Sequence, residues 1–151
     1  MPEEASWMTE ALAQAAEAVA AGEVPVGAVI VDPAAGVVLA RAHNLVEALG
    51  DPTAHAELLA IRAAAAALGR KRLEAADLYV TLEPCAMCAQ AIAFARLRRL
   101  YFGAYDPKGG GVEHGARIFG QPTCHHRPEV VGGLEETRAG ALLREFFRER
   151  R

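Results

Sequence analysis

The sequence predicts an α/β domain in which helices cover both faces of a mixed, mostly parallel sheet of five strands, a three-layer α/β/α arrangement. Runs of apolar and β-branched residues alternate along the chain with stretches of helical periodicity, and this alternation implies right-handed crossovers between parallel strands. A chain of 151 residues can bury roughly 70% of its unfolded surface. No repeat or low-complexity tract interrupts it, so we expect a single domain over residues 1–151.

The first part of the chain predicts a helix followed by a β-hairpin. Residues 5–21 carry apolar side chains at helical spacing, and Gly22 ends the pattern. The apolar stripe consists of Met8, Leu12, Ala15 and Val19. Residues 26–31 and 37–42 are strand-like, and the Asp-Pro-Ala-Ala-Gly sequence between them is typical of a turn. We therefore expect these two strands to pair as a hairpin.

A second helix is predicted to start at Asp51-Pro52, a capping residue followed by a first-turn proline, and to run through an alanine-rich stretch to Gly69. Its buried stripe is expected to contain Leu58, Ile61, Ala65 and Leu68. Asn44 lies in the loop that leads into this helix. Its amide therefore either bonds a ligand or caps its own loop.

The next segment continues the alternation of strand and helix. Residues 77–82 read as a buried strand, and residues 99–103 read as another. Between them, residues 85–97 have the pattern of a helix, for which Pro84 suits the first helical position. The strand over 77–82 therefore leads directly into this helix.

The last part of the chain predicts a loop, a short strand and a helix. The loop, residues 105–115, is glycine-rich and expected to be mobile, and its Asp106 and Lys108 are either substrate contacts or turn residues. Residues 130–133 read as a short strand or turn, and residues 135–150 as a final helix with a basic end. The apolar side of that helix is made by Leu142, Leu143, Phe146 and Phe147.

The residues that suggest chemistry are His55, Cys85 and Cys88. One imidazole and two thiolates are ligands for zinc, and the tetrahedral preference of zinc leaves a fourth position for water. Cys85 and Cys88 are three positions apart, so both sulfurs can lie on one face of a helical turn. A helix N-terminus also favours the thiolate that zinc needs. The sequence therefore predicts a catalytic zinc site between two helix starts.

Glu57 follows His55 by two positions, which is about 200° around a helix. Both side chains are therefore not expected to reach one ion directly, and we interpret Glu57 as the base beside the metal. Two other interpretations remain open. The three ligands can belong to a closed structural zinc site completed by Cys124 or His125, or the Cys-x-x-Cys pair can be redox-active.

The composition limits the cellular context. Three cysteines, an odd number with two assigned to the metal, fit a reducing compartment, so we expect a cytoplasmic protein. The N-terminus is acidic, unlike a secretory signal, and no apolar run approaches the roughly 20 residues of a membrane span. The net charge of −3 gives no global attraction to nucleic acid, so RNA binding requires a local basic patch.

These motifs resemble the bacterial tRNA-specific adenosine deaminases, a family of the cytidine/deoxycytidylate deaminase superfamily that converts the wobble adenosine of an arginine tRNA to inosine. The resemblance extends over nearly the whole chain from Met8 onward. It is carried by Pro25–Val29, Asp51–Glu57, Leu78–Cys85, Phe102–Ala104 and Phe146–Arg148.

The resemblance implies a cytidine-deaminase-like fold, a homodimer, one zinc ion per subunit on His55, Cys85 and Cys88, and an anticodon stem-loop as substrate. It also implies that Glu57 is the proton shuttle, which takes a proton from water, passes it to N1 of adenine and assists the departure of ammonia. Asn44 would lie at the target base. The further substrate contacts would be Val26, Ala56, Glu83, Pro84, Asp106, Lys108, Phe147 and Arg148.

The chain departs from the family pattern in its glycine-rich loop. Lys108 is followed by Gly109-Gly110-Gly111-Val112-Glu113-His114, where many relatives have Gly-Ala and Gly-Ser. The departure concerns how the protein contacts the anticodon loop rather than the residues that bind zinc and transfer protons. Two alternatives therefore remain: a deaminase of free guanine, cytosine or cytidine that uses the same metal site, and a zinc-stabilised binding module without catalysis, for which Glu57 would be unnecessary.

Overall fold

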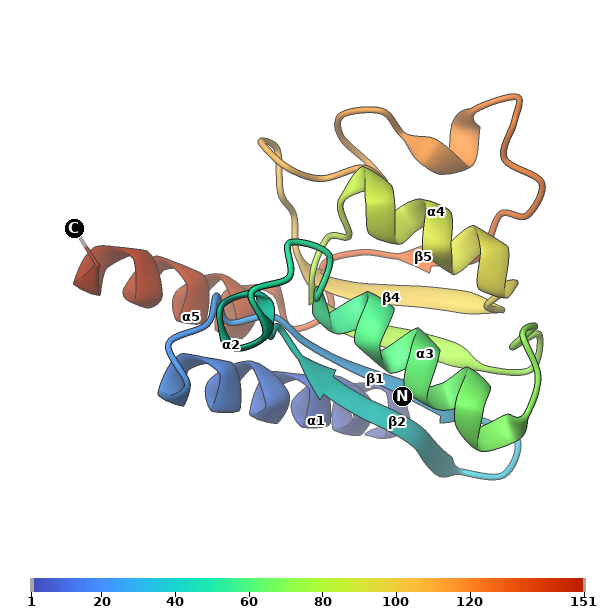
Figure 1. Ribbon diagram of the computed structural model, residues 1–151, viewed down its shortest axis with the longest axis horizontal. Coiled ribbons are helices and arrows are strands. Elements are labelled where there is room, and N and C mark those ends of the chain that lie inside the picture. The colour runs from blue at the N-terminus through green and yellow to red at the C-terminus, as the bar shows by residue number, and fades with distance from the viewer. Residues whose placement is uncertain (1, 151) are drawn as a thin grey trace.

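The computed structural model describes residues 2–150 and shows three layers, with helices on both faces of one sheet (Figure 1). Met1 and Arg151, the last residue of the basic C-terminal end, lie outside the described residues. The elements are α1 (Pro2–Ala20), β1 (Gly27–Asp32), β2 (Val37–His43), α2 (Val46–Leu49), α3 (Ala56–Leu68), β3 (Asp77–Leu82), α4 (Ala86–Ala95), β4 (Arg99–Ala104), η1 (Ile118–Gly120), β5 (Glu129–Val131) and α5 (Glu136–Glu149).

The sheet has five strands in the order β2-β1-β3-β4-β5. The predicted hairpin is present, since β1 pairs antiparallel with β2, and β1 also pairs antiparallel with β3. Parallel pairing occurs between β3 and β4 and between β4 and β5. The mixed five-stranded sheet is therefore confirmed, and its parallel part lies where helices alternate with strands.

Alternate side chains of the strands point to opposite faces of the sheet, as the strand period of two requires. Helices α1 and α5 cover the face that carries Val29, Val31, Tyr79 and Tyr101. Helices α3 and α4 cover the other face, with Ile30, Leu78, Val80, Leu100 and Phe102 beneath them. Gly27 lies under α1, where a Cβ would overlap the Ala11 carbonyl oxygen, so this helix packs directly on β1.

The predicted start of the second helix at Asp51-Pro52 is wrong. The Asp51 carboxylate accepts hydrogen bonds from the Thr53 amide at 2.8 Å and the Thr53 hydroxyl at 2.7 Å, so Asp51 closes a local turn of the type that aspartate favours. Helix α3 begins at Ala56, with His55 at its N-cap in an extended conformation. His55 therefore lies outside the helix.

The predicted buried stripe of this helix is also wrong. The buried residues of α3 are Ala56, Glu57, Ala60 and Ala64, whereas Leu58, Ile61 and Ala65 are half-buried and Leu68 is exposed. In an alanine-rich helix several faces are apolar, so the pattern does not identify the buried one. The small alanine side chains allow α3 to lie close to the sheet.

Helix α4 likewise begins later than predicted. Its first helical residue is Ala86, with Cys85 at the N-cap, so Pro84 precedes the helix instead of opening it. The final helix agrees with the prediction to within a residue at each end. None of the helices in the described part of the chain is long and apolar enough to cross a membrane.

Candidate active site

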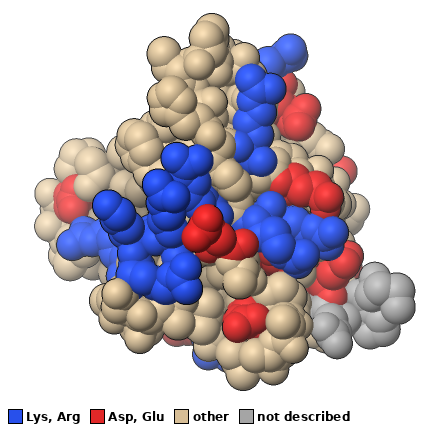
Figure 2. Space-filling model, turned by 90° about the vertical axis from the view of Figure 1, so that its right-hand side faces the viewer, with Lys and Arg blue, Asp and Glu red and all other residues tan. Residues whose placement is uncertain are grey.

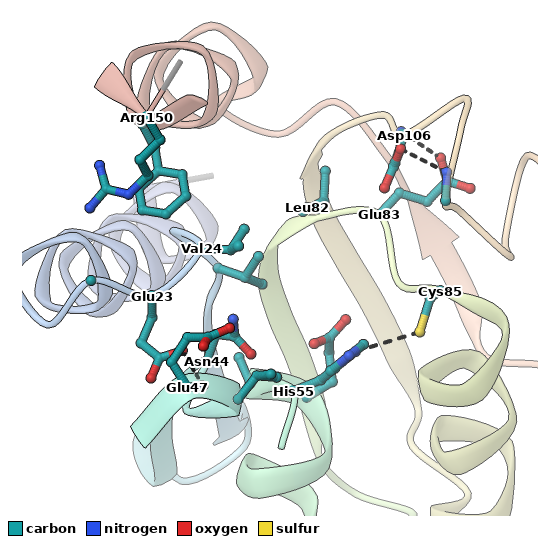
Figure 3. A pocket seen from close by; sticks show the side chains of 17 residues that line it. Glu23, Val24, Asn44, Glu47, His55, Leu82, Glu83, Cys85, Asp106 and Arg150 are labelled. Carbon is teal, nitrogen blue, oxygen red and sulfur yellow. Dashed lines mark hydrogen bonds between the residues drawn. The ribbon is translucent and has the colours of Figure 1, made fainter. Parts of the chain in front are cut away.

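The structure brings His55, Cys85 and Cys88 together at the N-terminal ends of α3 and α4. Figure 3 shows the His55 ring pointing at the Cys85 sulfur. His55 and Cys85 each occupy the N-cap position of their helix, with extended backbone and no side-chain capping bond. Their side chains are therefore free to point at a common centre. Cys88 is buried in the first turn of α4.

The distances between the three side chains fit a tetrahedral zinc ion. His55 Nδ1 lies 3.6 Å from Cys85 Sγ and 3.5 Å from Cys88 Sγ, and all three ligand atoms lie within 4.8 Å of one another. Zinc–sulfur bonds of about 2.3 Å and a zinc–nitrogen bond of about 2.0 Å, at tetrahedral angles, hold nitrogen and sulfur about 3.5 Å apart. The spacing is therefore that of two edges of one coordination tetrahedron.

The pKa values of the two thiols also favour the binding of a cation. The pKa of Cys85 falls to about 4, first because Cys88 donates a hydrogen bond to its thiolate and also because His55 does. The pKa of Cys88 is raised, because its proton serves in that hydrogen bond and because the thiol is buried. A metal ion bound by both cysteines would replace the shared proton and hold both side chains as thiolates.

No fourth protein ligand joins these three among residues 2–150, where His55, Cys85 and Cys88 form the only group positioned for a metal. The Cys124 thiol donates to the His126 carbonyl oxygen at 3.1 Å, and His126 Nε2 lies 2.7 Å from the Leu97 carbonyl oxygen. These side chains pack against the end of α4. The closed structural site completed by Cys124 or His125 is thus not formed, and the fourth position remains for a non-protein ligand.

Glu57 lies in the first turn of α3, with only 4% of its surface exposed. Burial raises the pKa of its carboxyl to about 7, and the carboxyl also hydrogen-bonds the Cys88 side chain. Because His55 is an extended N-cap residue, the angle of about 200° expected for two residues of one helix does not separate the two side chains. Glu57 therefore lies directly beside the three candidate ligands.

These groups open into a cavity of about 660 Å³, which we call the metal-side cavity. This volume lies in the range of small-molecule sites. Of the residues predicted as substrate contacts, the cavity is lined by Val26, Asn44, Ala56, Glu83 and Asp106. Pro84 is buried but does not line it, and the Pro84 carbonyl oxygen instead accepts the Gly111 amide at 2.8 Å.

A second cavity of about 880 Å³ adjoins the first, and the two linings share Val24, Leu82, Asp106 and Gly109. We call it the outer cavity. Its lining contains the remaining predicted contacts, Lys108, Phe147 and Arg148. The predicted site residues thus divide between an inner chamber beside the metal ligands and an adjoining outer chamber formed by α5 and the glycine-rich loop.

Sequence reasoning missed the wall that faces the metal ligands. Glu23 is fully buried, and its carboxylate accepts the amides of Glu47 at 3.0 Å and Ala48 at 2.7 Å, so it caps α2 at the cavity edge. Phe146 and Arg150 also line the cavity, with the Arg150 guanidinium 3.8 Å from the Phe146 ring centroid. Only the basic end of the chain offered a signal for Arg150, and none was available for Glu23.

Comparison with known proteins places these residues in a family context. Residues 1–104 match the family model described as the cytidine and deoxycytidylate deaminase zinc-binding region. The chain is 57% identical over 151 residues, 100% of its length and 98% of the relative's, to a tRNA-specific adenosine deaminase of Agrobacterium fabrum.

Two solved structures are similar to the fold. One, from work on A-to-I editing by tRNA:A34 deaminases at the wobble position of transfer RNA, has a TM-score of 0.88 and 56% identity and covers 91% of this chain and 99% of that chain. The other, a guanine deaminase from Nitrosomonas europaea, has a TM-score of 0.78 and 27% identity, over 97% of this chain and 84% of that chain.

The metal site predicts a specific dependence on its cysteines. Cys88→Ser replaces a buried thiolate ligand by a poor one, so zinc content measured by metal analysis should fall from one per chain to well below that value. Cys124→Ser is the matched control, because Cys124 only donates to the His126 carbonyl oxygen, which a hydroxyl also does, and it should retain its zinc. Equal zinc in both variants would show that the ligand set is different.

Proposed function

Because the chain belongs to the tRNA-specific adenosine deaminases of the cytidine and deoxycytidylate deaminase family, we propose that it hydrolyses the wobble adenosine of tRNA to inosine with release of ammonia. The geometric observation that supports this most directly is that the three ligand atoms of His55, Cys85 and Cys88 form one face of a coordination tetrahedron beside a buried carboxylate that lines a cavity. We further infer an arginine tRNA as the substrate and residues 1–151 as one catalytic domain.

The enzyme uses one zinc ion per subunit, and we assign His55, Cys85 and Cys88 as its ligands. Bound zinc supplies Lewis acidity, which lowers the pKa of a coordinated water toward neutrality. The Pro52 backbone hydrogen-bonds the imidazole of His55, and such an outer contact orients a metal-binding histidine. The ligand set is therefore supported by the chain that precedes α3 as well as by α4.

Glu57 is the group we assign to proton transfer. Its pKa of about 7, raised by burial, matches the requirement that a general acid/base both accept and release a proton near neutral pH. In its basic form the carboxylate takes a proton from water, and in its acidic form it delivers that proton to N1 of adenine. The carboxylate then takes the proton of the hydroxyl group that the water has left on C6 and gives it to the amine, so C6 becomes a carbonyl and ammonia departs.

The metal-side cavity supplies the surroundings of the base. Asn44 is 8% exposed and lines the same cavity as His55 and Cys85 (Figure 3), and we assign its amide to hydrogen bonding with the target base. Val26 and Ala56 provide apolar contact with the base faces. Glu83 and Asp106 form the adjoining wall, and Pro84 supports it through its carbonyl oxygen, which accepts the Gly111 amide.

The anticodon stem-loop is proposed to extend from this cavity into the outer cavity. Lys108 and Arg148 offer positive charge there, and Phe147, which is 48% exposed, offers a ring on which a base can stack. This arrangement supplies a local basic surface although the chain carries a net charge of −3. A deaminase of a free base would need only the inner cavity, so the outer one favours a polynucleotide.

A direct assay tests the function. The zinc-loaded protein should form inosine within an anticodon stem-loop, with release of ammonia, and give little or no product from free adenosine, cytosine or guanine. Guanine is the decisive comparison, because guanine deaminases share the fold. Preferred turnover of free guanine would overturn the tRNA assignment while leaving the metal chemistry intact.

Glu57→Gln tests the proton shuttle within that assay. The amide is isosteric but cannot accept the water proton, so kcat should fall about 10²–10⁴-fold or more while zinc content and thermal unfolding change little. Glu47→Gln is a matched control at the cavity edge. Glu47 contacts Glu23 through its backbone amide, and the substitution leaves that amide in place. Retained turnover in Glu57→Gln would contradict the mechanism.

Contacts between basic side chains and RNA phosphates predict that KM for the stem-loop depends on salt concentration. Arg148→Ala should raise KM for the stem-loop and reduce the slope of log KM against log salt by about 0.7, the value for one phosphate contact on a single strand. Arg70→Ala removes the same charge at the far end of α3, where Arg70 pairs with Glu74 at 3.6 Å, and should leave the slope unchanged.

An unchanged slope in Arg148→Ala would move the RNA contact to another basic surface. Figure 2 shows lysine and arginine side chains gathered on the face toward the C-terminal ends of α3 and α4. Lys71, Arg72 and Arg96 line a hollow of about 210 Å³ there. Arg98 is less available, because it forms two hydrogen bonds with Asp77, at 2.9 and 2.7 Å.

We propose a cytoplasmic location, because all three cysteines are free.

We propose a homodimer as the assembly. The outer face of α4 supports the dimer, since Met87 and Phe94 are 36% and 73% exposed and lie two helical turns apart on one side. Sedimentation velocity should give a dimer, and Phe94→Asp should shift it to monomer, whereas Val37→Asp on β2 should not. A monomeric wild-type protein that deaminates tRNA would refute this proposal.

A further inference from the structure

Glu83 is fully buried at the end of β3, two residues before the metal ligand Cys85. Its carboxylate accepts hydrogen bonds from four backbone amides of the glycine-rich loop. Oε1 accepts the Asp106 amide at 3.0 Å, and Oε2 accepts the Val112, Glu113 and His114 amides at 3.2, 2.9 and 3.1 Å. The His114 ring adds a contact from Nδ1 to Oε1 at 2.8 Å. One side chain therefore gathers both ends of this loop.

The glycines of the loop are required by the closeness of this packing. A Cβ on Gly110 would lie 2.5 Å from the Glu83 carboxyl carbon, and a Cβ on Gly111 would lie 2.6 Å from Ala86 Cα and 2.8 Å from the Cys85 carbonyl carbon. The Gly111 amide also donates to the Pro84 carbonyl oxygen at 2.8 Å. Gly110 and Gly111 thus let the loop rest on Glu83 and on the first turn of α4.

The loop carries groups that face both cavities. Asp106 lines the metal-side and outer cavities, and Lys108 lines the outer one. The Asp106 carboxylate accepts the amides of Lys108 at 3.3 Å and Gly109 at 2.9 Å. A chain of contacts therefore runs from Glu83 through Asp106 to the backbone of Lys108.

We propose that Glu83 is a positioning residue for substrate RNA, which holds the loop Asp106–Gly115 against the metal-binding turn so that Lys108 and Asp106 face the outer cavity. A carboxylate offers about four acceptor sites, and five donors already surround this one. Glu83 therefore acts on RNA through the loop rather than by direct contact. This inference rests on the proposed function, since it assigns the loop to the grip on the tRNA.

Glu83→Gln provides the test, because the amide keeps the size of the side chain but replaces one oxygen by a donor that repels the loop amides. KM for the stem-loop should rise about tenfold or more, as misplacement of a substrate-holding group produces, while zinc content stays at one per chain and kcat falls less than KM rises. Glu113→Gln removes the same charge from an exposed side chain in the same loop and should leave KM near the wild-type value.

A double-mutant cycle separates positioning from general damage. Lys108→Ala should raise KM in the wild-type background and have little further effect in Glu83→Gln, because a displaced loop no longer presents Lys108 to RNA. Fully additive effects of the two substitutions would overturn the proposal. If Glu83→Gln does not fold, His114→Ala removes only one of the five donors and should give a smaller rise in KM with the same non-additivity.

Hydrogen exchange supplies a readout that needs no activity. The amides of Asp106, Val112, Glu113 and His114 should exchange faster in Glu83→Gln than in wild type, with exchange in α3 unchanged. Unchanged loop exchange would overturn the positioning role. The wild-type protein can also fail to deaminate any stem-loop while the loop amides still exchange faster in Glu83→Gln. In that case the proposed function and the role of Glu83 in RNA binding both fail, and only its role in holding the loop remains.

Discussion

One spacing governs the site: an imidazole nitrogen must lie about 3.5 Å from each of two sulfurs for the three atoms to share one zinc ion. The chain meets it by ending two separate segments at neighbouring helix starts, with His55 and Cys85 as N-cap residues. Helices α3 and α4 pack on the same face of the sheet, and the alanines of α3 let its backbone lie close. The positive ends of both helix dipoles then face the thiolates, which they stabilise.

The walls around this centre are irregular backbone, whose amides need acceptors when they are buried. Two buried carboxylates supply them. Glu23 caps α2 on one side of the metal-side cavity, and Glu83 holds the glycine-rich loop on the other. Each carboxylate comes from a segment next to a strand of the sheet, so the rigid centre of the fold fixes the position of both walls. The loop expected to be mobile from its glycines is therefore tied at several points.

The sequence was sufficient for the strands, the hairpin and the three candidate ligands, because β-branched runs and a His-x-Glu with Cys-x-x-Cys are local signals. The sequence was insufficient for the start of α3 and for the face of α3 that is buried. Asp51 appeared to be a helix cap but bonds Thr53, and the alanines of α3 gave no preference for one face. Glu83 carried a motif-based role, yet its partners lie 23 to 31 positions away, a separation that no periodicity reports.

Two glutamates of this site, Glu83 and Glu57, have different roles. The difference lies in the hydrogen-bond donors around each carboxylate. For Glu83, burial favours the protonated acid, but the hydrogen bonds from the Asp106 amide, from His114 and from two further amides outweigh it and lower the pKa. Glu57 has no such array of loop amides, so burial dominates and raises its pKa to about 7. A carboxylate that must hold a wall needs a fixed charge, whereas one that must move protons needs nearly equal stability of its two forms. Because the fold gives four loop amides to Glu83 and only its own backbone amide to Glu57, it separates anchoring from proton transfer within one site.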